Sequence, residues 1–261
     1  MIDCDDILAP VGREAQITAS LRYGRFFRRL GAGRKATVRF TLDGEEIGEA
    51  GFGRDGAAAV VHIPREEKEY RITADCRLCP GGKSVTARAT LFARNTRKPG
   101  IILDIDRTLF ASSTFAAMFR RSRNVSPLAD AVEVTQELNQ RYDLIIVTGR
   151  KRYLKQKTKR WLRMKGFPPA PVFFAPAFRL LFSHERFKFE LIGGLKSSWP
   201  NIGIGIGDRN SDARAYLANG LRAIIIREKG PCPPGALGVQ DWREIRDLLL
   251  ANLNVSRASS P

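Results

Sequence analysis

The stretch of residues 99–110, PGIILDIDRTLF, decides the fold of the second half of the chain. Its apolar run at 101–103 is short enough for a buried strand of a parallel sheet. Asp104 and Asp106 follow two residues apart, so both carboxylates are expected at the carboxyl end of that strand, where open α/β sheets bind ligands. With the hydroxyl of Thr108, this acidic pair predicts a site for Mg²⁺, which prefers carboxylate oxygens. A solvated acidic turn is the alternative interpretation.

The sequence after residue 110 alternates between helix and strand patterns. Because repeated βα units imply a parallel, doubly wound sheet, residues 101–253 are expected to form one α/β domain. Pro127 is expected in the first turn of its first helix. Residues 254–261 are expected to form a flexible tail. Further buried strands are predicted at 144–147, 172–175, 202–206 and 223–226, and helices at 126–141, 151–165, 185–197 and 241–253.

The first 94 residues have the short, alternating apolar patterns of an all-β domain. Turn signals such as Asp43-Gly44, Asp55-Gly56 and Pro80-Gly81-Gly82 separate the patterns, which favours a sandwich. The segment TVRFTLDGEEIGEAGFGRDGAAAVVHI (37–63) resembles bacterial immunoglobulin-like modules. The polar residues 95–100 are expected to link the two domains. Strands are predicted at 16–22, 36–42, 57–63, 70–74 and 85–92, and this half shows no catalytic constellation.

The chain carries four cysteines, and its formal net charge is +17. The cysteines are too few and scattered for a disulfide framework, and the Cys76–Cys79 spacing lacks a second pair that would suggest zinc. No apolar run is long enough to span a bilayer, and the N-terminus lacks the pattern of a signal peptide. We therefore expect a protein of the reducing cytoplasm.

Most of the positive charge lies in the second half of the chain, where residues 150–165 hold nine lysines and arginines and no acidic residue. Such a field favours a polyanionic partner: a phosphorylated substrate, an anionic membrane or nucleic acid. Residues 22–35 (RYGRFFRRLGAGRK) also interleave arginines with aromatic residues. They are expected to form either a loop that packs its aromatics on the sandwich or a surface on which nucleic-acid bases stack.

Three predicted strands end in polar groups that should meet at one edge of the sheet. The groups are Asp104, Asp106 and Thr108 after the first strand, Thr148 and Gly149 after the second, and Asp208 and Asp212 after the fourth. Their motifs, DIDRT, VTGR, an FK pair at 187–188 and GDRNSD, resemble the four motifs of the haloacid dehalogenase (HAD) superfamily of Mg²⁺-dependent phosphatases. The resemblance is closest to the lipin-type phosphatidate phosphatases, which also have an immunoglobulin-like companion domain. It implies a HAD-like sheet preceded by a small immunoglobulin-like sandwich.

The resemblance also implies roles for these residues. Asp104 would be the nucleophile that forms an aspartyl-phosphate, and Asp106 the general acid and base. Mg²⁺ would be held by Asp104, Asp106 (through its backbone carbonyl), Asp208 and Asp212. The substrate phosphate would be bound by Thr108, Thr148, Gly149, Arg150 and Arg209, with Thr148 and Gly149 at the start of a helix.

Lys188 is the expected catalytic lysine. It lies in the first turn of its predicted helix, whereas Lys196 lies about 12 Å further from the catalytic edge at 1.5 Å per residue. Arg107 stands where many relatives have glycine, so an unusual backbone conformation there would carry a steric cost. We expect Arg107 to face the substrate.

The predicted function is Mg²⁺-dependent hydrolysis of a phosphomonoester on a bulky anionic substrate such as phosphatidate. The absence of a long insertion that could form a cap and the basic helix at 151–165 favour this function, and they suggest peripheral association with the inner face of the membrane. In that helix we expect Tyr153, Leu154, Trp161 and Leu162 to face the core and Lys155, Lys159 and Arg163 to face solvent. The alternatives are a nucleic-acid terminal phosphatase, a phosphatidate-binding module without catalysis, and a nucleic-acid-binding protein.

Overall fold

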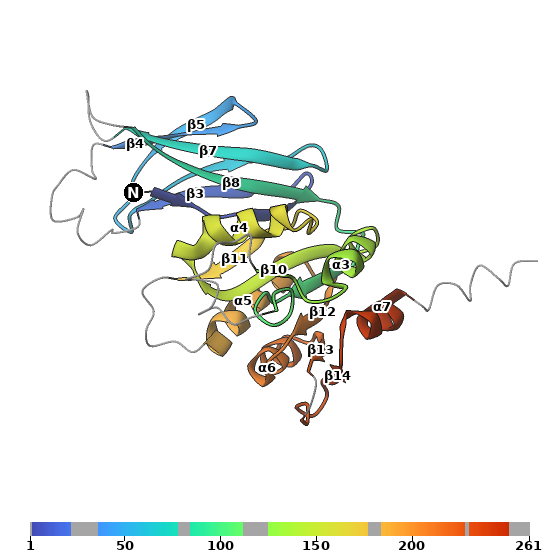
Figure 1. Ribbon diagram of the computed structural model, residues 1–261. Coiled ribbons are helices and arrows are strands. Elements are labelled where there is room, and N and C mark those ends of the chain that lie inside the picture. Colours follow the sequence, from blue (N-terminus) through green and yellow to red (C-terminus); the bar gives the residue numbers. More distant parts are fainter. Residues whose placement is uncertain are drawn as a thin grey trace, which may run out of the picture. The chain divides into compact units, whose positions relative to one another are not determined.

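The computed structural model describes residues 2–21, 36–77, 84–111, 125–176, 184–227 and 230–250. The chain divides into two compact units, Met1–Asn95 and Thr96–Pro261. Figure 1 shows a first unit of strands and a second unit in which helices surround a sheet. Several predicted features lie outside the described residues: the basic stretch 22–35, Cys79, the turn at 80–82 and the tail 254–261.

The first unit consists of two β-sheets around a common core. One sheet has the strand order β1-β3-β6, and the other has the order β2-β8-β7-β4-β5. Alternate side chains of β4, among them Val38 and Phe40, are fully buried together with Ile17 of β3 and Ile72 of β7. The unit is therefore all-β, as predicted. Its strands are β1 (Ile2–Cys4), β2 (Ile7–Pro10), β3 (Ala15–Leu21), β4 (Thr37–Leu42), β5 (Glu45–Gly51), β6 (Ala57–His62), β7 (Glu69–Arg77) and β8 (Ser84–Arg94).

The second unit is built on a six-stranded sheet in which every neighbouring pair is parallel. Its strand order is β11-β10-β9-β12-β13-β14, so chain order reverses between β9 and β12. In open α/β sheets this reversal leaves a crevice at the carboxyl ends of the two strands. The strands are β9 (Gly100–Leu103), β10 (Asp143–Lys151), β11 (Val172–Ala175), β12 (Ile202–Gly207), β13 (Arg222–Ile226) and β14 (Leu237–Val239).

Helices cover both faces of this sheet. On one face, residues of α3 (Ala131–Asn139), α4 (Lys155–Met164) and α7 (Trp242–Leu250) share a core with Ile204 and Ile206 of β12. Gly205 lies between those two isoleucines and faces the other side. There the ring of Tyr216 in α6 (Asn210–Ala218) comes so close that a Cβ on Gly205 would lie 2.3 Å from it. Another helix, α5 (His184–Ser198), packs against α6.

Two predicted helix starts were wrong. The helix predicted at 126–141 begins only at Ala131, after Asp130 in the left-handed backbone region (φ 60°), and Pro127 instead bridges to Phe110. The helix predicted at 151–165 begins at Lys155, because β10 continues to Lys151 and a 3₁₀ turn, Arg152–Leu154, follows it.

The sequence analysis also missed several elements. Strands β1, β2 and β14 have only three or four residues, which is too short for a clear apolar pattern. Helix α6 carries the polar GDRNSD motif at its start, which conceals its helical period. Within the described residues, Cys4, Cys76 and Cys232 are free thiols, and no helix is long and apolar enough to cross a membrane.

Candidate active site

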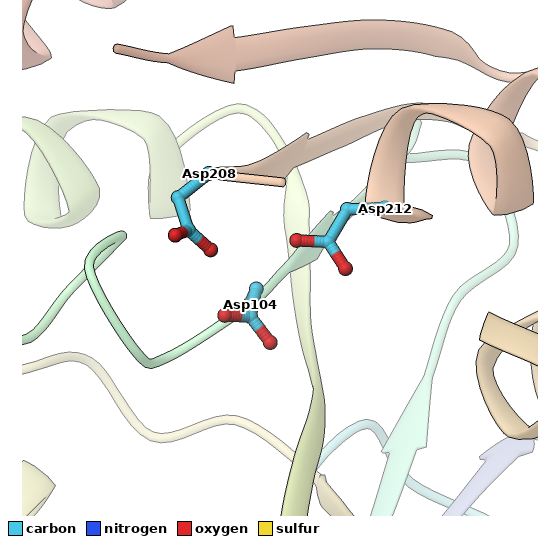
Figure 2. A group of neighbouring side chains, drawn as sticks. All are labelled: Asp104, Asp208 and Asp212. Carbon is cyan, nitrogen blue, oxygen red and sulfur yellow. The ribbon is translucent and has the colours of Figure 1, made fainter. Parts of the chain in front are cut away.

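Three carboxylates converge where chain order reverses in the sheet. Asp104 follows β9, Asp208 follows β12, and Asp212 lies in the first turn of α6. One oxygen from each lies within 4.8 Å of the others, and Figure 2 shows the three side chains around a common space. The sheet brings together residues that are about a hundred positions apart in the sequence.

Backbone contacts fix the positions of these carboxylates. The N–H of Asp104 donates to the carbonyl of Ile206 at 2.9 Å, which ties the end of β9 to β12. Asp212 Oδ2 accepts the N–H of Arg209 at 3.3 Å and so closes the start of α6. The carboxylate of Asp212 lies directly against Gly207, where a Cβ would be 2.7 Å from Oδ2. A residue other than glycine at 207 would therefore displace Asp212.

Lys188 bridges two of the three carboxylates. Its Nζ donates to Asp104 Oδ1 at 2.5 Å and to Asp212 Oδ1 at 2.7 Å, and its side chain is only 4% exposed. Lys196 instead donates to the carbonyl of Gly220 at 3.1 Å on the protein surface. One ammonium therefore faces three carboxylates, which leaves an excess of negative charge in a largely buried site.

The pKa values reflect this excess. Burial raises the pKa of Asp104 to about 7; Lys188 opposes the shift, and the charge of Asp212 adds to it. Burial and the charge of Asp212 raise the pKa of Asp208 to about 6, against the opposing charges of Arg209 and Lys188. Burial disfavours the charge of Lys188, but Asp104 and Asp212 outweigh it and raise its pKa above the ordinary value.

This donor set fits a divalent cation. Carboxylate oxygens are the ligands that Mg²⁺ prefers, and a cation among them would offset the charge that Lys188 leaves uncompensated. Asp104, Asp208 and Asp212 could hold it. The side chain of Asp106 is not part of this cluster; its predicted contribution through the backbone carbonyl stays a prediction.

A cavity of 220 Å³ is lined by two of these carboxylates, those of Asp104 and Asp212. Of the predicted residues, Gly149 and Arg209 belong to its wall, together with the catalytic candidates Asp106 and Lys188. Four wall residues were not predicted as site residues. Three of them lie before α4, which begins later than predicted, and the fourth lies in the first turn of α6. They are Lys151, Tyr153, Leu154 and Ser211.

Three of the predicted phosphate ligands do not line this cavity. Arg150 is 3% exposed and forms an ion pair with Asp106, at 2.8 Å between Nη2 and Oδ1. Thr148 is fully buried, and its hydroxyl accepts the N–H of Arg150 at 3.2 Å. Thr108 is also fully buried, and its hydroxyl has no hydrogen-bond partner among the described residues. Thr148 and Gly149 lie within β10, so the expectation that they begin a helix was wrong.

Two predictions on the faces of the basic helix were also wrong. Tyr153 is 55% exposed, although it was predicted to face the core, and Lys155 is 4% exposed, although it was predicted to face solvent. The 3₁₀ turn at Arg152–Leu154 shifts the helical register relative to a helix that would begin at Lys151. Trp161 and Leu162 are buried as predicted.

Arg107 adopts a backbone conformation that favours glycine. Its φ is 59°, its N–H donates to the carbonyl of Phe110 at 2.8 Å, and its side chain is exposed. Its positive charge lowers the pKa of Asp208, which places it near the carboxylate cluster. The predicted steric cost at this position is therefore present.

Comparison with known proteins gives a family match for the second unit. Residues 101–226, just under half of the chain, match the family model of the LNS2 domain of PITM 1-3. No curated protein matches the chain.

Similar solved structures include the Pnkp1/Rnl/Hen1 RNA repair complex (18% identity, 56% of this chain and 45% of that chain, TM-score 0.41). They also include fibronectin(III)-like modules of Clostridium thermocellum CbhA (15% identity, 36% of this chain and 98% of that chain, TM-score 0.27). The immunoglobulin-like assignment of the first unit stays a prediction. Over residues 101–226 the chain is similar to the LNS2 domain, a lipin-like family related to the HAD phosphatases.

Proposed function

We propose that this chain is a Mg²⁺-dependent phosphomonoester hydrolase, and that its substrate is a bulky anionic phosphate ester such as phosphatidate. The observation that carries the proposal is the convergence of the carboxylates of Asp104, Asp208 and Asp212. Lys188 bridges two of them, Asp104 and Asp212, in the wall of an open cavity. Such a site can hold a cation and leave one carboxylate, that of Asp104, directed at a bound phosphate.

In the proposed reaction, a carboxylate oxygen of Asp104 attacks phosphorus, and the bond to the leaving oxygen breaks as Asp106 gives that oxygen a proton. Water then attacks the aspartyl-phosphate, Asp106 takes a proton from the water, and inorganic phosphate leaves Asp104. Lys188 orients Asp104 and offsets negative charge in both steps. Mg²⁺, held by the three carboxylates, would further neutralise the charge of the phosphoryl group.

Two features support a bulky anionic substrate. The LNS2 match relates the second unit to lipin-like proteins, for which phosphatidate was the expected substrate class. The cavity wall combines cationic Lys151 and Arg209 with the exposed ring of Tyr153, so its mouth can accept both negative charge and apolar surface. The relationship to LNS2 is an analogy, and the site residues carry the chemical argument.

A phosphatidate-binding module without catalysis is the second candidate, because the LNS2 match is compatible with lipid binding alone. Binding would need Mg²⁺, Lys188 and the cationic wall residues Lys151 and Arg209, whereas hydrolysis would also need a nucleophile and an acid. Asp104 and Asp106 are both present and both line the cavity, which favours hydrolysis.

Phosphate release from several substrates tests the proposal. Dioctanoyl phosphatidate, 4-nitrophenyl phosphate and a 3′-phosphorylated oligonucleotide would be compared with Mg²⁺ and with EDTA. Asp104→Asn should lower turnover by roughly 10³-fold or more, because it removes the nucleophile at almost constant volume. Asp247→Asn, at an exposed position on α7, is the matched control.

Each outcome separates the candidates. Release from phosphatidate that depends on Mg²⁺ and on Asp104 supports the proposal. Release from the oligonucleotide alone would favour a nucleic-acid phosphatase. Vesicle binding without release from any substrate would favour the binding module.

A further inference from the structure

Arg150 lies behind Asp106 and holds both of its carboxylate oxygens. Arg150 Nε donates to Oδ1 at 3.2 Å and to Oδ2 at 3.1 Å, and Nη2 donates to Oδ1 at 2.8 Å. The arginine side chain is 3% exposed and the aspartate side chain 16% exposed. Such fork-shaped pairing fixes the plane of the carboxylate as well as its position.

The guanidinium is itself held from two other sides. Its Nη1 donates to Thr158 Oγ1 of α4 at 3.2 Å, and its central carbon lies 4.4 Å from the ring centroid of Phe110. Both contacts lie within the second unit. Arg150 is therefore held by Thr158 and Phe110 as well as by Asp106, and in this orientation it holds both carboxylate oxygens of Asp106.

The arrangement separates Asp106 from the cation-binding carboxylates. Asp106 lines the cavity but is not in the cluster of Asp104, Asp208 and Asp212, and Arg150 does not line the cavity at all. To reach a phosphate, Arg150 would have to leave Asp106, Thr158 and Phe110, and breaking this ion pair would leave the buried guanidinium without its carboxylate partner, which is costly.

We infer that Arg150 is a positioning residue for Asp106 rather than a phosphate ligand. It turns the Asp106 carboxylate toward the leaving oxygen of the substrate and away from the cluster of Asp104, Asp208 and Asp212. This inference rests on the proposed function, because it concerns how Asp106 is presented during phosphoester cleavage. Thr158 extends the arrangement to α4, since its hydroxyl helps to orient the guanidinium.

Two aryl phosphates of similar shape test this role. The leaving group of phenyl phosphate is phenol, whose pKa of about 10 makes proton donation to the leaving oxygen important. The leaving group of 4-nitrophenyl phosphate is stable enough as an anion to leave without a proton. Loss of Asp106 as an acid should therefore affect phenyl phosphate more. A purely structural defect should lower kcat for both substrates by the same factor.

The variants are Asp106→Asn, Arg150→Gln, Arg150→Lys and the double variant Asp106→Asn/Arg150→Gln. We expect Asp106→Asn to lower kcat for phenyl phosphate by roughly 10²-fold or more, within the range of general acid–base catalysis. Arg150→Gln should lower the phenyl to 4-nitrophenyl kcat ratio at least tenfold, with little change in KM. The double variant should be no slower than Asp106→Asn. Arg150→Lys should not restore the ratio, because an ammonium cannot hold both oxygens in one plane.

Controls distinguish the possible failures. Arg160→Gln makes the same chemical change at an exposed position of α4 and should leave both rates unchanged. If Arg150→Gln does not fold, Thr158→Val removes only one contact of the guanidinium and should give a smaller shift of the ratio in the same direction. An unchanged ratio in folded Arg150→Gln, or losses that multiply in the double variant, would overturn the inference while leaving the proposed function intact. A wild-type protein that hydrolyses neither these esters nor dioctanoyl phosphatidate would overturn both.

Discussion

Lys188 Nζ lies 2.5 Å from Asp104 Oδ1, although the two residues are 84 positions apart in the sequence. The contact joins α5 to the end of β9 and places the Lys188 ammonium beside the predicted nucleophile. Among the described residues, Lys188 is the only cationic side chain that forms an ion pair with the carboxylate cluster. Lys188 therefore has a structural task before any substrate binds, because it offsets part of the repulsion between Asp104 and Asp212.

Replacing Lys188 with methionine should affect both stability and turnover. The substitution keeps the approximate length of the side chain but leaves two buried carboxylates without their partner, which typically costs about 3–5 kcal/mol. Thermal unfolding should occur at a lower temperature, and turnover of 4-nitrophenyl phosphate should fall far more than in Lys196→Met. The latter is a matched control because Lys196 donates to a backbone carbonyl at the surface. An equal loss of turnover in the two variants would contradict the assignment of Lys188.

Replacing Arg107 with glycine should stabilise the fold. A non-glycine residue in the left-handed region typically costs about 1–2 kcal/mol, and Arg107 has φ 59°. Glycine removes that cost but adds flexibility to the unfolded chain, so we expect a net gain of roughly 1 kcal/mol or less. Chemical denaturation measures it. Arg160→Gly serves as the control, because Arg160 lies exposed within α4, where glycine is unfavourable, and this variant should lose stability instead.

The same Arg107 variant tests whether this side chain faces the substrate. If it does, Arg107→Gly should raise KM for phosphatidate in vesicles and leave Tm higher than in the wild type. A stabilised variant with unchanged kinetics would show that Arg107 contributes only strain.

The sequence predicted correctly the positions of those candidate site residues that are determined by the end of a strand. Asp104 and Asp208 follow two apolar runs, and parallel pairing brings the ends of such strands to one edge. The position of Lys188 could be argued from the rise per residue along a helix. In each case one regular element fixes the position of the residue.

The predictions that failed depend on contacts between elements. Nothing in VTGRK shows that β10 continues to Lys151, and this continuation decides the faces of Tyr153 and Lys155. Asp106 and Arg150 were both expected at one edge of the sheet, but the sequence does not show that they form an ion pair with each other. An arginine beside a predicted phosphate site is naturally assigned to the phosphate, and only the geometry shows that a carboxylate already holds it.

The metal-free protein should become less stable as the pH rises. The pKa of Asp104 is raised to about 7 and that of Asp208 to about 6, from ordinary values of 3.8. Between about pH 4 and 7 the folded chain therefore binds more protons than the unfolded chain, and the free energy of unfolding falls as the pH increases. The lowered pKa values of Asp43 and Glu185 act below their ordinary values of 3.8 and 4.5, and so below the interval from pH 5 to 7.5. Thermal unfolding in EDTA at pH 5 and 7.5 measures the effect, and Asp104→Asn should reduce it.

Mg²⁺ should reverse this trend. Because a cation competes with protons for the same carboxylates, its stabilising effect should be larger at pH 7.5 than at pH 5. The rise in Tm with increasing Mg²⁺ at the two pH values gives the comparison. A rise that is the same at both pH values, or absent at both, would argue against a metal site at these carboxylates.

The exposed basic residues of α4 should contribute to membrane binding. Lys155 is buried, so the test uses Arg160 and Arg163, whose side chains are exposed on the same helix. Each basic group near an anionic surface contributes about 1 kcal/mol, and salt screens it beyond roughly 8–10 Å. Reversing both to glutamate should weaken binding to vesicles that contain phosphatidate by roughly 10- to 100-fold, and the loss should shrink at high salt.

Turnover of 4-nitrophenyl phosphate should barely change in this double reversal, since neither arginine lines the cavity. The pair Arg243→Glu/Arg246→Glu makes the same change in net charge on α7 and therefore separates a local effect from a general one. If both pairs weaken binding equally, the total charge of the protein, and not α4, attracts the membrane. If vesicle binding is unchanged but binding to a 3′-phosphorylated oligonucleotide weakens, the basic face of α4 serves nucleic acid, and the lipid substrate class would have to be abandoned.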